Sequence, residues 1–401
     1  MKKRLAIITS HPIQYNVPLF RLLTERDNLE ILVFYTWGKG VLNNKYDPGF
    51  GRIINWDIPL LEGYPSKFLL NVSKDPGTHH FRGIINPTII DELDEYNPDV
   101  ILVYGWSFSS HLKVMRHYKG KTPVFFRGDS TLLDDKQGLK PMLRRMALKW
   151  IYKKVDVAFY VGRNNREYFE KAGLGEGQLV FAPHAVNNDF FMDNSGSYEL
   201  EGNRRRQDLG ISDNCFVFLF AGKFENKKSP LLLLEAFEKA FEATFESETL
   251  PGDIHLIFVG NGDLEVSLKA RAKNKPGINR IHFIDFQNQK QMPIVYRSGD
   301  VFVLPSGGPG ETWGLAINEA MACGRAVLAS TRCGGAVDLI QEGVNGYIFE
   351  AGSVESLKSR MMLLVQQRTK SKEMGQASLT HIDHFSLNRL ADTIEQTVLT
   401  F

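Results

Sequence analysis

The chain has 401 residues, of which 43% are hydrophobic and 23% are charged, and its formal net charge is +2. This length exceeds that of a typical domain, and the composition is too apolar for a disordered chain, so we expect two folded domains. The nearly balanced charge argues against a nucleic-acid-binding protein, because such proteins carry a basic surface on the scale of a domain.

The first residues resemble the start of a signal peptide, because lysines precede an apolar run. That run extends only from Leu5 to Ile8, so we interpret it as a first strand. No run approaches the roughly 18 to 20 apolar residues that span a bilayer. We expect a cytoplasmic protein, attached to a membrane at most peripherally. Cys215, Cys323 and Cys333 form no CxxC pair, which favours core cysteines in a reducing compartment over disulfides or structural zinc.

In the first half of the chain, short apolar runs alternate with segments of helical period, which is typical of βαβ units. The runs predict strands at 4–9, 30–36, 99–105, 122–127, 156–161 and 178–183. The segments between them predict helices at 17–25, 86–96, 109–118, 141–154 and 164–173. Residues 39–84 break this pattern and receive no assignment.

Residues 187–214 are polar and lack a sustained apolar period, so we interpret them as the connection between two domains. The alternation then begins again. Apolar runs occupy 215–222, 254–260, 280–286, 292–299, 300–306 and 326–330, and helices are predicted from Pro230, at 263–273 and at 314–323. Ligands of such sheets bind beyond the carboxyl ends of the strands, so the loops after strands are the places to search for chemistry.

The first of these loops in the second half carries Lys223, Lys227 and Lys228 before a helix start, marked by Ser229 as the expected N-cap and by Pro230. Cations are unfavourable at a helix amino terminus unless an anion shares the space. The lysines therefore indicate a phosphate site. The alternative is that they extend into solvent and bind nothing.

Two further loops carry candidate residues. Gly260 and Gly262 follow a strand and would permit close backbone approach to a ligand, or form only a turn. Glu319 lies in a helix that is apolar around most of its circumference, so its buried carboxylate needs partners. These partners are hydroxyls of a sugar or ribose, backbone amides, or a basic residue of the same domain. Glu311, in a glycine-rich loop, is also compatible with a solvated turn residue.

Taken together, these residues resemble the GT-B glycosyltransferases, and within them the retaining enzymes of glycosyltransferase family four. Glu311 and Glu319 match the E-x7-E spacing of that family within the segment 305–327, and Lys223 and Lys228 match its basic pair. The resemblance implies two Rossmann-like, doubly wound parallel-sheet domains that face a central cleft. Residues 1–195 would form the acceptor-side domain and 205–380 the nucleotide-sugar domain, with a helix in 381–401 that packs back on the first domain.

The resemblance also implies roles for individual residues. Lys223 and Lys228 would hold the donor diphosphate, Glu311 would bind sugar hydroxyls, and these three are the candidate catalytic residues. Glu319 would bind the ribose. The other implied donor-binding residues are Gly222, Gly260, Phe286, Gly314 and Leu315. Many relatives carry a His-Asp pair where this chain has Gly128 and Asp129, so the candidates on the acceptor and sugar side are His11, Gln14, Tyr15, Arg127 and Asp129.

The implied reaction is transfer of a hexosyl group from a nucleotide-diphosphate sugar, with a UDP-sugar favoured, to a saccharide or lipid-linked acceptor in cell-envelope polysaccharide synthesis. The anomeric configuration would be retained, and neither a metal nor a cofactor would be required. One alternative is a nucleotide-sugar epimerase or phosphorylase on the same frame. Another is an inactive sugar-binding protein, although such a protein would not need the charges that stabilise a leaving group.

The helix predicted in 140–154 has both an apolar stripe and a high positive charge. Its stripe consists of Leu143, Met146, Ala147, Trp150 and Ile151, and its basic residues are Lys140, Arg144, Arg145, Lys149 and Lys153. In one interpretation the stripe packs on the first sheet and the charges are solvated. In the other, the charges face an anionic membrane that carries a lipid-linked acceptor.

Overall fold

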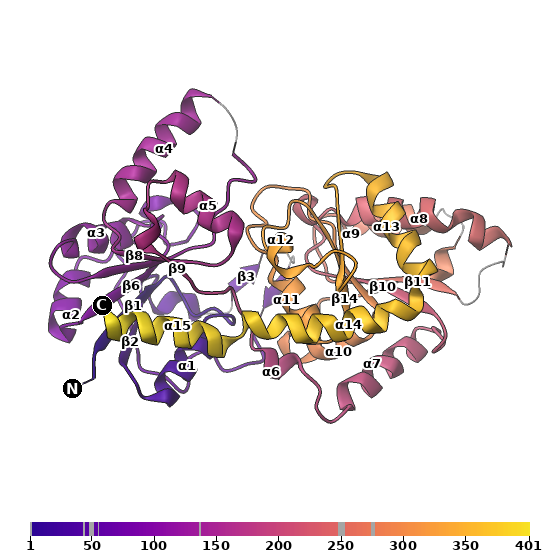
Figure 1. Ribbon diagram of the computed structural model, residues 1–401, viewed down its shortest axis with the longest axis horizontal. Helices are drawn as coiled ribbons and strands as arrows, with labels where there is room; N and C mark the ends of the chain where they lie inside the picture. The colour runs from indigo at the N-terminus through magenta and orange to yellow at the C-terminus, as the bar shows by residue number, and fades with distance from the viewer. Residues whose placement is uncertain are drawn as a thin grey trace. The chain divides into compact units, whose positions relative to one another are not determined.

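The computed structural model describes residues 2–42, 45–47, 52–54, 56–135, 138–247, 253–273 and 277–401. The chain divides into two compact units (Figure 1). Unit 1 comprises Met1–Lys45, Ile58–Ala185 and Ser386–Phe401, and unit 2 comprises Tyr46–Asp57 and Val186–Phe385.

Unit 1 is built on a parallel sheet of seven strands in the order β5-β2-β1-β6-β7-β8-β9. The strands are β1 Arg4–Thr9, β2 Glu30–Tyr35, β5 Ser66–Phe68, β6 Val100–Tyr104, β7 Val124–Arg127, β8 Val157–Tyr160 and β9 Leu179–Phe181. All six strands predicted in the first half are present. The stretch without an assignment supplies β5 and a separate two-stranded pair, β3 Lys45–Asp47 with β4 Arg52–Ile54.

Helices cover both faces of this sheet, because successive strand residues point to opposite sides. Leu5 and Ile7 share a core with α1 (Val17–Arg26) and α15 (Leu387–Thr400). Ala6 and Ile8 share the opposite core with α2 (Ile89–Tyr96), α3 (Ser109–Tyr118), α4 (Leu139–Tyr152) and α5 (Arg163–Lys171). The C-terminal helix α15 therefore belongs to unit 1, where Arg26 of α1 forms ion pairs with Asp392 at 2.6 Å and Glu395 at 3.1 Å.

The orientation of α4 differs from the interpretation in which its predicted apolar stripe packs on the first sheet. Of the five stripe residues, only Ile151 is buried, and Leu143, Met146, Ala147 and Trp150 are exposed. The other buried residues on this helix are Leu148 and Tyr152, which lie outside the predicted stripe. The helix carries two apolar stripes with the same period. The stripe that continues into the buried Val155 packs on the sheet, which leaves the other in solvent.

Unit 2 is built on a parallel sheet of six strands in the order β12-β11-β10-β13-β14-β15. The strands are β10 Phe216–Ala221, β11 Ile254–Val259, β12 Ile281–Ile284, β13 Val301–Leu304, β14 Ala326–Ser330 and β15 Gly346–Phe349. The helices are α6 Asn188–Phe191, α7 Ser197–Asp208, α8 Pro230–Ser247, α9 Glu265–Lys273, α10 Met292–Arg297, α11 Leu315–Ala322, α12 Ala336–Leu339, α13 Val354–Gln366 and α14 Arg368–Ile382. The apolar run 292–299 is thus mainly helix α10.

The interpretation of 187–214 as an interdomain connection is wrong, because α6 and α7 fold within unit 2. Helix α7 packs against α10, and its buried residues are Gly202 and Arg206 rather than apolar side chains. A Cβ at Gly202 would lie 2.9 Å from the carbonyl carbon of Arg297. Arg206 donates to the Ser298 carbonyl and to Asp300, both at 3.0 Å. A helix that packs through a glycine and an arginine leaves no apolar period in the sequence.

The length and apolar character of the described helices show whether any of them could cross a membrane. None of these helices combines the length and the apolar character that crossing a bilayer would require.

Candidate functional site

Strands β10 and β13 lie side by side at the centre of the unit 2 sheet, and the chain leaves them toward opposite edges. Open α/β sheets bind ligands at such a switch point, because the loops after the two strands diverge there. The two loops begin at Gly222 and Pro305. They are joined through the Lys227 carbonyl, which accepts from the amides of Gly307 at 3.0 Å and Gly308 at 3.2 Å.

An ion pair connects these loops. The ammonium of Lys228 lies 2.5 Å from Oε2 of Glu311, and the Ser306 hydroxyl donates to the same oxygen at 2.9 Å. Glu311 is 8% exposed, so the alternative of a solvated turn residue is wrong. Burial alone would raise the pKa of the Glu311 carboxyl, but the charges of Lys228 and Lys227 and the hydrogen bonds outweigh it and lower the pKa. Glu311 is therefore an anion that can accept hydrogen bonds.

The other two lysines occupy the same loop in different ways. Lys223 lies two residues after the end of β10 and is half-buried, and its carbonyl accepts from the Glu225 amide at 3.0 Å. The Lys227 side chain lies near Gly310, and its charge acts on Glu311. Ser229 precedes α8 as predicted, but its φ is +50° and its hydroxyl donates back to the Asn226 carbonyl at 3.2 Å. Lys227 and Lys228 thus lie beside the turn that holds Glu311, and Lys223 precedes them on the loop after β10.

Helix α11 carries Glu319 into the interior, as the sequence predicted. Glu319 is 4% exposed and accepts a 2.6 Å hydrogen bond from the Tyr296 hydroxyl of α10. One of its partners is thus a tyrosine, which was not among the expected donors. The helix begins after Gly314, whose φ of +94° favours glycine, and Leu315 is its first residue.

The loops after β10, β11 and β12 pack closely together. A Cβ at Gly260 would lie 2.0 Å from the Gly222 carbonyl oxygen, so these two predicted residues are adjacent. Asn261 accepts from the Phe286 amide at 2.8 Å, which attaches the third loop. Sequence reasoning singled out Gly260 and Phe286 but missed Asn261, which lies between the two glycines of the GNG turn.

In unit 1, three of the predicted residues share the loop after β1. The His11 Nδ1 lies 2.9 Å from the Ser10 hydroxyl, and its ring meets the Trp37 ring edge-on at 5.1 Å between centroids. Gln14 and Tyr15 are half-buried on the same loop. Strand β1 stands at the switch point of the unit 1 sheet, between β2 and β6, so this loop has the position that favours ligands in such a sheet.

The other predicted pair in unit 1 divides into two environments. Arg127 is buried, and its terminal nitrogens donate to the carbonyls of Ala182 and Pro183, both at 2.9 Å, which gives it a structural role. Asp129 interacts with His184, a residue that sequence reasoning missed. Burial and the Arg127 charge lower the pKa of His184 to about 4, although Asp129 opposes the shift. The signal for His184 was its position directly after a predicted strand.

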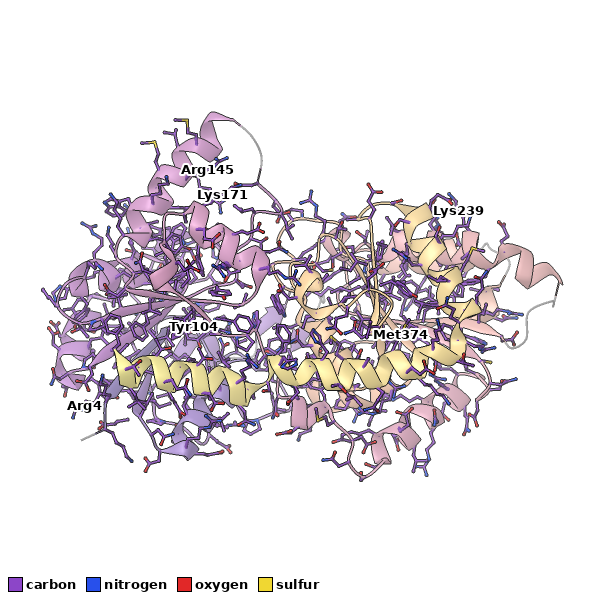
Figure 2. All side chains as sticks on the ribbon, viewed as in Figure 1. Arg4, Tyr104, Arg145, Lys171, Lys239 and Met374 are labelled. Atoms are coloured by element: carbon purple, nitrogen blue, oxygen red, sulfur yellow. The ribbon has the colours of Figure 1, made fainter. Side chains whose placement is uncertain are left out.

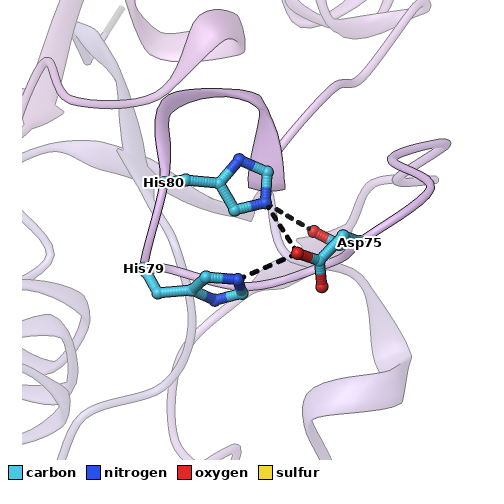
Figure 3. Close-up of side chains that lie close together, drawn as sticks. All are labelled: Asp75, His79 and His80. Atoms are coloured by element: carbon cyan, nitrogen blue, oxygen red, sulfur yellow. Dashed lines mark hydrogen bonds and ion pairs between the residues drawn. The ribbon is translucent and has the colours of Figure 1, made fainter.

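Two groups of side chains among the described residues have the composition of metal ligands. One is the exposed loop group Asp75, His79 and His80 (Figure 3), in which both imidazoles approach the Asp75 carboxylate, at 3.0 and 3.3 Å. The other is Cys215, Asp253 and His255, at the amino ends of β10 and β11. Neither group contains a residue of the Lys228–Glu311 pair, and the expectation that no metal is required stays a prediction.

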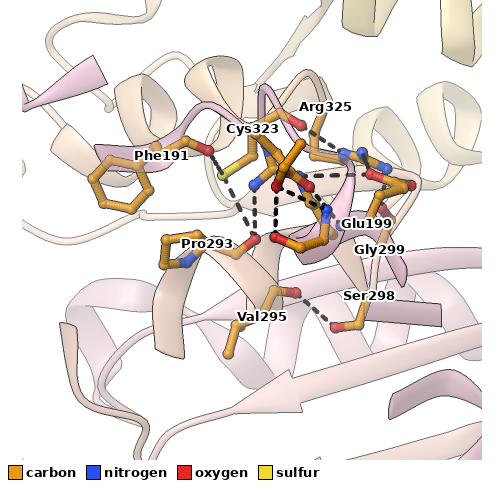
Figure 4. Close-up of polar contacts among 12 residues, drawn as sticks. Phe191, Glu199, Pro293, Val295, Ser298, Gly299, Cys323 and Arg325 are labelled. Carbon is orange, nitrogen blue, oxygen red and sulfur yellow. Dashed lines mark hydrogen bonds and ion pairs between the residues drawn. The ribbon is translucent and has the colours of Figure 1, made fainter. Parts of the chain in front are cut away.

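The end of α11 is anchored by a polar network (Figure 4). Arg325 donates to the carbonyls of Cys323 at 3.0 Å and Gly299 at 3.3 Å, and it forms an ion pair with Glu199 of α7 at 2.5 Å. The three cysteines are free and buried, as predicted for core residues. This network fixes α11 relative to α7 and α10, and with it the position of Glu319.

Comparison with known families assigns the part of the chain that contains this site. The family profile described as glycosyl transferases group 1 matches residues 202–380. We call this matched segment, residues 202–380, the group 1 domain. This group 1 domain contains every predicted donor-side residue, from Gly222 to Glu319, whereas the acceptor-side candidates lie outside it.

Several curated relatives of this chain are named as glycosyltransferases. The sulfoquinovosyl transferase SQD2 of Arabidopsis thaliana is 26% identical over 309 residues, which cover 73% of this chain and 55% of the relative. The D-inositol 3-phosphate glycosyltransferase of Segniliparus rotundus is 27% identical over 191 residues, 47% of this chain and 40% of the relative. The chain spans about half the length of the curated relatives it matches.

Solved structures resemble the whole chain. HepE of Anabaena, in complex with UDP and glucose, has a TM-score of 0.71 at 17% identity, with both chains covered completely. A glycosyltransferase of Rickettsia africae also has a TM-score of 0.71, at 16% identity, with 99% of each chain covered. With the two parallel-sheet units, these neighbours identify the fold as GT-B, as the sequence resemblance predicted.

Proposed function

We propose that the chain transfers a hexosyl group from a nucleoside-diphosphate sugar to a saccharide or lipid-linked acceptor, with retention of the anomeric configuration. The observation that carries this proposal is the Lys228–Glu311 pair at the switch point of the group 1 domain. A UDP-sugar is the first donor to test, because the solved neighbour HepE was crystallised with UDP and glucose.

The chemistry requires charge stabilisation on the leaving group. The bond between the anomeric carbon and the diphosphate oxygen breaks with its electron pair on the diphosphate, so a fixed cation nearby lowers the barrier directly. Lys228 is 18% exposed and oriented by Glu311, which limits its rearrangement when an anion arrives. Lys223 and Lys227 on the same loop, and the amino terminus of α11, add positive potential.

Glu311 and Glu319 are proposed to bind the hydroxyl groups of the donor. The lowered pKa of Glu311 keeps it a hydrogen-bond acceptor at neutral pH, and a carboxylate acceptor suits the hydroxyl donors of a sugar. Glu319 has four lone-pair sites, of which the Tyr296 hydroxyl uses one. Ribose hydroxyls are donors of the same kind as the Tyr296 hydroxyl, so we assign the ribose to Glu319.

A panel of labelled nucleotide-sugars with saccharide and lipid-linked acceptors tests the proposal, with the product analysed by NMR. We expect a glycoside with the anomeric configuration of the donor, and activity that survives EDTA. An inverted product would remove the retaining assignment. Formation of an epimer, or of a sugar phosphate, would favour the epimerase or phosphorylase alternatives, and donor binding without turnover would favour a sugar-binding protein.

A further inference from the structure

Helix α4 presents two opposite apolar faces. Its inner face is buried, with the Tyr152 ring 5.3 Å from Phe126 and 5.5 Å from Phe169 between centroids. Its outer face exposes four large apolar side chains, Met142 (59%), Leu143 (65%), Met146 (60%) and Trp150 (47%). Positions 142, 146 and 150 fall on one side of a helix, with 143 beside them, so the four side chains form one stripe.

Basic residues surround this outer stripe. Between residues 138 and 155 the sequence contains six lysines and arginines and no acidic residue. Arg145, Lys149 and Lys153 are exposed along one side of the stripe, and Figure 2 labels Arg145 on this helix. Lys154 lies on the other side, with its ammonium 3.5 Å from the centre of the Trp150 ring. The outer face of α4 is therefore apolar along its middle and cationic at its edges.

This combination matches a membrane surface better than a protein partner. Contiguous exposed apolar side chains are uncommon on a monomer and indicate a binding surface. A second copy of α4 packed on this face would be related by a twofold axis, which would bring the basic edges against each other. An anionic lipid surface instead offers phosphates to the edges, an acyl boundary to the stripe, and an interfacial layer that tryptophan prefers.

We propose that the outer face of α4 binds an anionic membrane, with Met142, Leu143, Met146 and Trp150 at the acyl boundary and Arg145, Lys149 and Lys153 at the lipid phosphates. Binding requires both parts of the surface. A basic cluster without apolar residues would bind any polyanion, whereas an apolar stripe without charge would not distinguish anionic from neutral lipid. The proposal does not depend on the sugar-transfer reaction.

Sedimentation with phosphatidylcholine vesicles, with or without phosphatidylglycerol, tests the proposal. We expect binding only to the anionic vesicles, and weakening by added salt. Arg145→Glu with Lys149→Glu should reduce the affinity by about thirtyfold or more, since each cation near the surface contributes about fivefold. Leu143→Ser with Met146→Ser should also reduce it. The matched controls are Lys370→Glu with Lys372→Glu on α14, and Leu200→Ser with Val266→Ser, all at exposed positions.

The environment of Trp150 gives a second readout. Its emission should shift to shorter wavelength with anionic vesicles, and Trp150→Phe should remove most of that shift. Equal binding to neutral and anionic vesicles, no binding to either, or wild-type binding by the Arg145/Lys149 variant would overturn the proposal. A dimer in light scattering that Leu143→Ser with Met146→Ser dissociates would identify a second copy of the chain as the occupant instead.

Discussion

The ammonium of Lys228 and the carboxylate of Glu311 lie 2.5 Å apart although 83 residues separate them in sequence. Pairing of β10 with β13 brings their loops together, and each loop then contributes one charge to the ion pair. Both side chains are largely removed from solvent, at 18% and 8% exposure. Each charge thus makes the other tolerable in the interior.

A double-mutant cycle tests this dependence. Lys228→Met and Glu311→Gln should each lower the free energy of unfolding, because each leaves one partly buried charged or polar group without its partner. The double variant should be less destabilised than the sum, with a coupling of about 1–2 kcal/mol. Urea unfolding of the four proteins measures this coupling, and additive effects would contradict a stabilising pair.

Tyr296→Phe should destabilise the protein by about 1–3 kcal/mol, because it removes a donor from the buried Glu319 carboxylate without changing the size of the ring. Tyr347→Phe, at another buried ring of unit 2, is the control and should cost less. Thermal unfolding compares the two variants. An equal cost at both positions would mean that the Tyr296 hydroxyl does not stabilise Glu319.

Gly260→Ala should destabilise the protein by about 2 kcal/mol or more, because its φ is +140° and the new Cβ would collide with the Gly222 carbonyl. Gly177→Ala is the matched control, since its Cβ would meet no atom within 4 Å. We expect the control to unfold near the wild-type temperature. If both variants unfold at the same temperature, the close contact between the Gly260 and Gly222 loops does not contribute to stability.

Stability should fall as the pH falls from about 6.5 toward 4, in part through His111. Burial lowers the pKa of His111 to about 4, against hydrogen bonds that raise it, while an unfolded histidine has a pKa of about 6.5. Within that window the unfolded chain binds a proton that the folded chain does not. The free energy of unfolding therefore falls by at most about 1.4 kcal/mol for each pH unit.

The variant His111→Gln isolates this contribution. Glutamine can donate to the Gly105 carbonyl or accept from Thr36, as His111 does now, but it does not titrate. Unfolding measured at several pH values should show a smaller loss of stability for the variant than for the wild type. The same slope for both proteins would exclude His111 as a source of acid sensitivity.

The strands and the donor-side loops could be predicted from sequence because each carries a local signal. Strands such as β1 and β10 are continuous apolar runs, and Glu311 and Glu319 stand at a recognisable spacing. The pairing of Lys228 with Glu311 could not be predicted, since it depends on which strands are neighbours. The Tyr296 partner of Glu319 was hidden for the same reason.

The predictions from sequence failed where packing leaves either no apolar period in the sequence or one that can be read in two ways. Helix α7 packs through Gly202 and Arg206, so its sequence appears to be a linker. Helix α4 has two equivalent stripes, and the choice between them depends on its neighbours in the core. Arg127 was expected to face a substrate. Its guanidinium instead donates to the carbonyls of Ala182 and Pro183, which follow a strand distant in sequence.

The central claim is that Lys228 stabilises the departing diphosphate. The rate of sugar transfer from the best nucleotide-sugar donor tests it most directly. This rate is compared between the wild type, Lys228→Ala and Lys227→Ala. Lys228→Ala should lower the rate by about a hundredfold or more while remaining folded. Lys227→Ala should lower it much less, because the contact that joins the two loops uses the Lys227 main chain, which the substitution preserves. Near-normal transfer by a folded Lys228→Ala protein would contradict the account.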